Sequence, residues 1–149
     1  MFIGQMCNRN VVSARRETSI AEAAQIMRKF HVGNVIVVEP VGGGDRPIGI
    51  VTDRDMVLEV LAQGLDPAKV TLGDLVTQSL VTIEEHADYM DAIHLMVSRN
   101  IRRLPVVSAG GLLAGIVALD DVVRALALPL AELSDLSARG RKRELQQRP

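Results

Sequence analysis

The sequence contains one segment written twice, and this repeat constrains the fold more than any other feature. Residues 49–57 (GIVTDRDMV) reappear as residues 115–123 (GIVALDDVV), which lie 66 positions later. Upstream, residues 19–27 align with residues 88–96 at a spacing of 69, and the glycine-rich loop after Val41 absorbs the difference. Because an ordered repeat of this kind specifies one supersecondary unit per copy, the chain is predicted to contain two similar units.

Each copy is predicted to begin with an extended segment and a helix. The extended segments are residues 10–13 and 79–83. Ser19 and Asp88 are expected to be helix N-caps, since each is followed by an acidic residue three positions later. The apolar residues that follow keep the spacing of one buried helix face, so a helix that packs on a core is expected in both copies.

The second half of each copy is predicted to be two strands and a helix. The strands are expected at 35–38 and 49–51 in the first copy, and at 104–107 and 115–117 in the second. The following helices are predicted to end at Gly64 and before Pro129. Neither copy can bury both sides of a three-stranded sheet alone, so the two are expected to pack about a pseudo-twofold axis. The predicted fold class is therefore α+β and sandwich-like, with two tandem β-α-β-β-α units at residues 5–66 and 67–128.

Composition and charge narrow the class of protein. The chain is 48% apolar, has a net charge of −1, and has no apolar run long enough for a membrane span. Cys7 is the only cysteine and no secretory signal is recognised, so a cytoplasmic location without membrane contact is expected. Residues 129–149 form a basic tail that is predicted to be flexible. Nucleic-acid binding by this tail is the weaker alternative, because the chain has almost no aromatic residues for base stacking.

A β-α-β-β-α unit that carries G-h-h-T-x-x-D at its second hairpin strand, and is written twice, resembles the CBS (cystathionine β-synthase) domain family. The resemblance covers about residues 5–128 and includes Leu104-Pro105-Val106-Val107. It implies a non-catalytic regulatory module whose central cleft holds up to two ligands. These would be AMP, ADP, ATP or S-adenosylmethionine, bound as regulators and not as required cofactors. Binding would be signalled by a conformational shift to an unidentified effector protein.

The resemblance also implies which residues bind. In the family, the Asp that ends the motif accepts hydrogen bonds from ribose hydroxyls, and the motif Thr helps to hold ribose or phosphate. Asp55, Thr52 and Asp121 occupy these positions, and Ala118 replaces the second threonine. Family geometry groups Asp121 with Arg103, Val12, Val32 and Gly33, and groups Thr52 and Asp55 with Asn34, Val81, Ile101 and Arg102. The competing interpretation is that both aspartates only cap helices.

An enzyme and a ligand-free interaction module are the two other classes of function for such a chain. Cys7, His31, His86 and His94 show no spacing typical of a catalytic or metal site, so neither an enzyme nor a metal protein is expected. The alternative function is a ligand-free dimerisation or interaction module. The resemblance implies a homodimer formed through helices, and the candidate surface is Met56, Val57, Val60, Leu61, Val122, Val123 and Leu126. Intrachain core packing is the competing role for these side chains.

Overall fold

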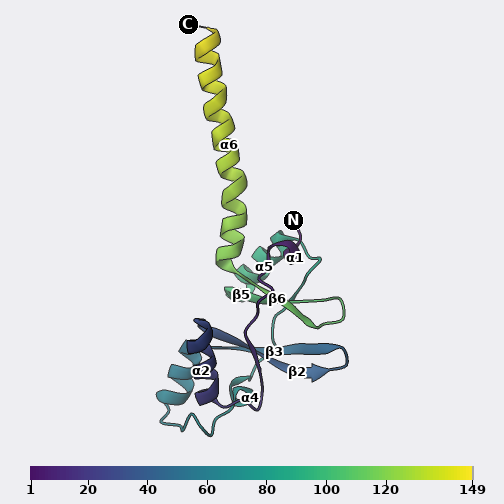
Figure 1. Ribbon diagram of the computed structural model, residues 1–149, viewed down its shortest axis with the longest axis vertical. Helices are drawn as coiled ribbons and strands as arrows, with labels where there is room; N and C mark the ends of the chain where they lie inside the picture. The colour runs from purple at the N-terminus through teal and green to yellow at the C-terminus, as the bar shows by residue number, and fades with distance from the viewer. Residues whose placement is uncertain (149) are drawn as a thin grey trace.

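A computed structural model describes residues 1–148 and contains two three-stranded sheets, one in each repeat (Figure 1). The first repeat comprises β1 (Ser13–Arg15), α2 (Ile20–Phe30), β2 (Asn34–Val41), β3 (Gly44–Thr52), α3 (Asp53–Met56) and a π-helical turn η1 (Val57–Leu61). The second comprises β4 (Ile83–Glu84), α5 (Tyr89–Arg99), β5 (Arg103–Val107), β6 (Leu113–Ala118) and α6 (Leu119–Gln147). Two short helices, α1 (Ile3–Met6) and α4 (Leu72–Leu75), precede the repeats. The predicted α+β fold with two tandem units is confirmed.

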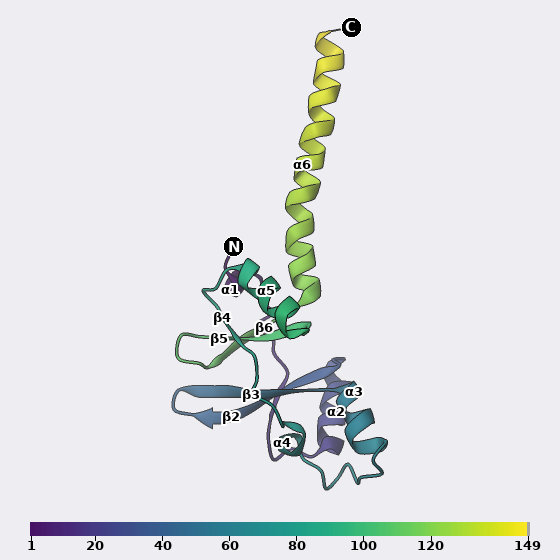
Figure 2. The ribbon, with the colours of Figure 1, turned by 180° about the vertical axis from the view of Figure 1, so that it is seen from behind.

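The two sheets have the same topology and the same irregularities. In each sheet a short first strand pairs parallel with the middle strand, and the hairpin β2–β3 or β5–β6 pairs antiparallel. A bulge interrupts the hairpins at matching positions, Val37/Val38 and Val106/Val107. The long helices also end alike, because His31 and Asn100 both adopt the left-handed conformation that terminates a helix. The two hairpins stack on each other at the centre of the molecule through β3 and β6 (Figure 2).

The short helices are exchanged between the units. Ile3 of α1 is fully buried in the second core, and Leu72 of α4 is fully buried in the first. Isolated β-bridges join Phe2 to Asp88 and Ser19 to Thr71, so both exchanges use equivalent positions. Each unit is completed by a segment that precedes the other one, which ties the two together about a pseudo-twofold relation. The unit boundaries at residues 66 and 67 stay a prediction.

Two glycines allow these exchanged segments to approach the sheets. A Cβ built on Gly49 of β3 would lie 2.6 Å from Cγ2 of Val76, just after α4. A Cβ on Gly115 of β6 would lie 2.7 Å from Sγ of Cys7, just after α1. Such distances are too short for real carbon contacts, so only glycine fits at either position.

The last helix differs from the prediction. Helix α6 continues through Pro129 to Gln147 and projects away from both sheets (Figure 1). The predicted helix end before Pro129 is therefore wrong. A proline inside a helix removes one backbone hydrogen bond, but alanine, leucine, glutamate and arginine dominate this segment and favour helix on both sides of it. Among residues 1–148, no helix is long and apolar enough to cross a membrane. The flexibility of residues 129–149 stays a prediction.

A candidate ligand-binding cleft between the two units

The largest cavity described lies between the two units and has a volume of about 690 Å³. Its walls come from β3, from the start of the helical segment after it, from α4 and the chain that follows, and from the region between α5 and β5. Acidic groups line it from the first unit and the α4 segment, namely Asp55, Glu59 and Asp74. Basic groups line it from the second unit, namely Arg99 and Arg103. The apolar lining includes Ile50, Leu80, Val81 and Ile101.

Asp55 and Thr52 form a reciprocal capping pair at the start of α3. The Asp55 backbone N–H donates to Thr52 Oγ1 (3.1 Å), and the Thr52 N–H donates to Asp55 Oδ2 (2.9 Å). Helix capping is thus one role of Asp55. Its other carboxylate oxygen, Oδ1, accepts no hydrogen bond from residues 1–148. Because Asp55 lines the cleft, that oxygen is available to a hydroxyl donor from a ligand.

Asp121 occupies the matching position at the start of α6 but has different surroundings. Its Oδ2 accepts from the Ala118 N–H (2.8 Å), while Oδ1 lies 3.7 Å from the Arg124 guanidinium. Asp121 lines a separate cavity of about 300 Å³ near Met6 and the base of α6. Cys7 lies close to Asp121, and its partial burial raises the pKa of its thiol. The Arg9 guanidinium lowers this pKa, and the carboxylates of Glu85 and Asp121 raise it.

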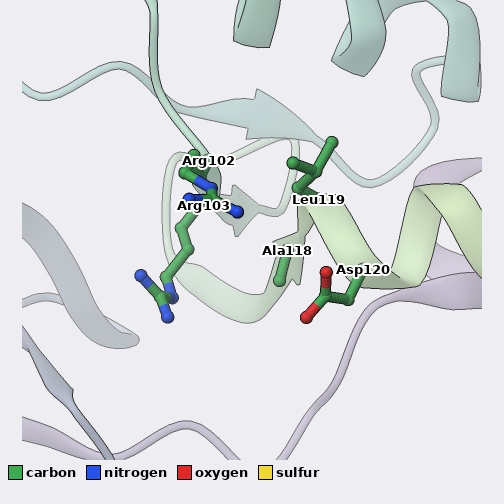
Figure 3. A pocket seen from close by; sticks show the side chains of 5 residues that line it. All are labelled: Arg102, Arg103, Ala118, Leu119 and Asp120. Carbon is green, nitrogen blue, oxygen red and sulfur yellow. The ribbon is translucent and has the colours of Figure 1, made fainter.

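The neighbouring arginines line different cavities. Arg103 lies at the cleft that contains Asp55 as well as at a smaller cavity of about 230 Å³, whereas Arg102 lines only the smaller one. Figure 3 shows both arginines on one side of the smaller cavity and Asp120 on the other, with Ala118 between them. Arg103 thus lies at the cleft with Asp55 and also at the smaller cavity with Arg102 and Asp120, and the grouping of the two arginines expected from the family stays a prediction.

The other predicted site residues divide into two groups. Val81 and Ile101 line the cleft with Asp55, as the family geometry implies. Asn34 pairs with Thr52 across the sheet, next to the cleft wall. The remaining three, Val12, Val32 and Gly33, do not line this cleft: Val12 and Val32 pack against the first core, and the Gly33 carbonyl accepts from the Asp53 N–H.

Sequence reasoning missed several residues of the cleft. Arg99, Glu59, Asp74 and the chain at residues 76–80 all line it. One signal could have found the last of these. The repeat extends upstream at the same spacing of 69, because Ile3-Gly4 matches Leu72-Gly73, and this places the chain after α4 among the equivalent elements.

The chain at residues 77–82, which borders the cleft, has unpaired backbone groups. Within residues 1–148, none of its N–H or C=O groups takes part in a hydrogen bond. The cleft arginines are also free of ion pairs: in the same part of the chain, neither Arg99 nor Arg103 has an acidic partner within 4.0 Å. No group of three His, Cys, Asp or Glu side chains suited to a metal ion occurs among these residues.

Known proteins resemble the chain in sequence and in structure. A model of the CBS domain matches residues 3–62 and 72–128. Protein MK0525 of Methanopyrus kandleri is 37% identical over 122 residues, which is 82% of this chain and 61% of that protein. The chain thus spans less than two thirds of that relative.

Two solved structures share the fold over most of their length. Hypoxic Response Protein I, with two coordinated zinc ions, has a TM-score of 0.73 and 32% identity, covering 84% of this chain and 98% of that one. The CBS domain pair of protein MJ0100, in complex with 5-methylthioadenosine and S-adenosylmethionine, has a TM-score of 0.72 and 26% identity, covering 85% and 96%. With its two matched repeats and their shared topology, the chain belongs to the CBS-domain family.

Proposed function

We propose that this chain is a non-catalytic regulatory module that binds an adenosyl ligand in the cleft containing Asp55. The observation that carries the proposal is the Asp55 carboxylate, which lines the cleft, is held by the Thr52 N–H through one oxygen, and accepts no hydrogen bond from residues 1–148 at the other. A carboxylate fixed in this way can accept hydrogen bonds from the two vicinal hydroxyls of a ribose. The ligand-bound CBS pair of MJ0100 supports the choice of ligand class.

The rest of the cleft suits the remaining parts of such a ligand. Its volume of about 690 Å³ falls within the range of about 300–1,000 Å³ that is typical of small-molecule sites. The side chains of Ile50, Val81 and Ile101 offer an apolar surface to a base. Arg99 and Arg103 suit an anionic phosphate or carboxylate group, since neither guanidinium is already paired.

The position of the cleft supports a regulatory role. Its walls come from both units, so a ligand in it contacts both and stabilises the relative arrangement to which it binds best. An effector protein that distinguishes the two arrangements would receive the signal. The identity of this effector is open.

The test is a thermal-shift and calorimetric titration with AMP, ADP, ATP and S-adenosylmethionine. A ligand that binds the folded chain selectively raises its melting temperature, by an amount set by its concentration relative to Kd. We expect at least one of the four to do so, and we expect Asp55→Ala to remove the shift. A well-folded chain that binds none of them would refute the proposal and favour the ligand-free interaction module.

We also propose that two copies associate through exposed apolar helix surfaces. Of the predicted surface, Met56, Val60 and Val122 are buried and belong to the cores. The others remain exposed, with Val57 at 51%, Leu61 at 66%, Val123 at 54% and Leu126 at 38%. Exposed apolar patches of this kind mark association surfaces. Light scattering should give the mass of a dimer, and Leu61→Glu with Leu126→Glu should give a folded monomer; a monomeric parent chain would refute this arrangement.

A further inference from the structure

One backbone segment is hydrogen-bonded in the first repeat, whereas the equivalent segment of the second repeat is not. In the first repeat, residues 8–12 are tied to strands of both units. Asn8 exchanges two backbone hydrogen bonds with Ile116 of β6 (2.8 and 2.9 Å), and the Ile36 N–H donates to the Val12 carbonyl (3.0 Å). The Arg9 guanidinium adds a hydrogen bond to the Ala114 carbonyl (3.3 Å). The equivalent residues 77–81, and Thr82 after them, make no backbone hydrogen bond within residues 1–148.

Pro105 accounts for one of the missing bonds. It lies on β5 where β2 has Ile36, at the repeat spacing of 69, and it is fully buried. Proline has no N–H, so it cannot donate to the Val81 carbonyl as Ile36 does to Val12. The parallel pairing in the second sheet accordingly starts one residue later, at Ile83 with Val106, than in the first, at Ser13 with Ile36.

We propose that Pro105 is a specificity-determining residue that selects the cleft containing Asp55 as the single ligand site of each chain. The proposal rests on the function proposed above. By withholding a hydrogen bond from Val81, Pro105 leaves the segment 77–82 as an unpaired backbone edge along that cleft. The equivalent edge at residues 8–12 of the first repeat already pairs with β2 and β6.

The chemistry of adenine explains why an unpaired backbone edge matters. Adenine presents an N6 amino donor next to a ring-nitrogen acceptor, which complements the C=O acceptor and N–H donor of an extended peptide. Such a base can pair with residues 77–82 without displacing anything. Along residues 8–12 it would have to replace up to three backbone hydrogen bonds, each worth about 2- to 10-fold in an equilibrium constant, so binding there should be about 10- to 1,000-fold weaker.

The experiment is calorimetry on the full chain with AMP and with S-adenosylmethionine, using a reciprocal pair of variants. Pro105→Ile supplies the missing N–H in the residue type that the first repeat uses there. Ile36→Pro is the matched control, because it removes the N–H that donates to Val12 in the other repeat and replaces no residue that lines the Asp55 cleft. We expect one site per chain, a loss of about 10-fold in affinity for Pro105→Ile, and unchanged affinity at the Asp55 cleft for Ile36→Pro.

Two further measurements keep the result interpretable. Pro105→Val provides a second N–H-bearing variant if Pro105→Ile does not fold, with far-UV circular dichroism and melting temperature as the check. Amide hydrogen exchange of residues 77–82 should be fast in the free parent chain and slower when ligand is bound.

The inference and the proposed function fail in different ways. Two equal sites per chain, or a folded Pro105→Ile that binds as tightly as the parent while Asp55→Ala does not bind, would overturn the role of Pro105 and leave the function intact. Absence of binding by the parent chain would overturn both.

Discussion

Thr52 and Asp55 hold each other through two hydrogen bonds, whereas Ala118 and Asp121 share only one. In the first repeat, the Thr52 hydroxyl accepts from the Asp55 N–H while the Asp55 carboxylate accepts from the Thr52 N–H. In the second, the Asp121 carboxylate accepts from the Ala118 N–H, and the alanine has no oxygen with which to return the bond. The equivalent helix start therefore has two capping hydrogen bonds in the first repeat and one in the second.

The first prediction follows from this difference. Thr52→Ala should lower the free energy of unfolding by about 1 kcal/mol, because it removes the hydroxyl that satisfies the Asp55 N–H. The reciprocal Ala118→Thr should raise it by a similar or smaller amount, because it completes the box at Asp121. Urea denaturation followed by circular dichroism measures both. If Ala118→Thr lowered the free energy of unfolding as much as Thr52→Ala does, the capping hydrogen bonds would not be the cause of either change.

The second prediction separates the adjacent arginines. Arg103→Gln should weaken AMP binding by about 10- to 100-fold, the value of a charge-assisted hydrogen bond, and leave adenosine binding within about 2-fold. The reason is that Arg103 lines the cleft with Asp55 and has no acidic partner among residues 1–148. Arg102→Gln is the matched control, since Arg102 lies outside that cleft, and it should alter neither ligand. Equal losses of affinity for AMP and for adenosine would show that Arg103→Gln acts by disturbing the fold and not by removing a contact with the phosphate.

Much of the fold could be predicted from the sequence because local and long-range signals agree in it. The repeat fixes the number of units, and Ser19 and Asp88 mark the starts of α2 and α5 as predicted. The exchanged helices α1 and α4 escaped prediction because four residues are too few to show a helical period. Pro129 misled the prediction of α6 because a single unfavourable residue was outweighed by its helix-forming neighbours.

The site could be predicted only where the motif itself forms it. Asp55 lies at the cleft, and the motif that it ends also contains the start of α3, so the sequence alone indicates its position at the start of the helix. That Arg103 lines the cleft could not be foreseen, because it depends on where β5 begins and on how the two units pack. Arg99 lies at the end of α5, and its approach to the cleft depends on how the two units pack.

The third prediction concerns the close approach of α4 to β3. Gly49→Ala should lower the free energy of unfolding by about 1–3 kcal/mol, because the new methyl group would overlap the Val76 side chain. Adding Val76→Ala should recover part of this loss, since the clash is with a side chain and not with backbone. Gly42→Ala is the control, because a Cβ there meets nothing within 4 Å and should have little effect. Additive losses in the double variant would rule out direct contact as the cause.

The fourth prediction uses Cys7 as a probe of the exchanged helix α1. Burial raises the pKa of the Cys7 thiol, and the Arg9 guanidinium partly offsets this by lowering it. At pH 8 the folded chain should therefore contain less thiolate than the urea-unfolded chain, and iodoacetamide should alkylate it more slowly.

Arg9→Gln separates this electrostatic account from simple shielding of the thiol. Loss of the guanidinium should move the midpoint of the rate-against-pH curve upward, because the group that favours the thiolate is gone. Arg9 also donates to the Gly4 and Ala114 carbonyls, so its loss could instead release the segment that follows α1. Release would expose the thiol to water and move the midpoint downward. The sign of the shift therefore shows whether Arg9 acts on Cys7 mainly through its charge or mainly by holding residues 7–12 against β6.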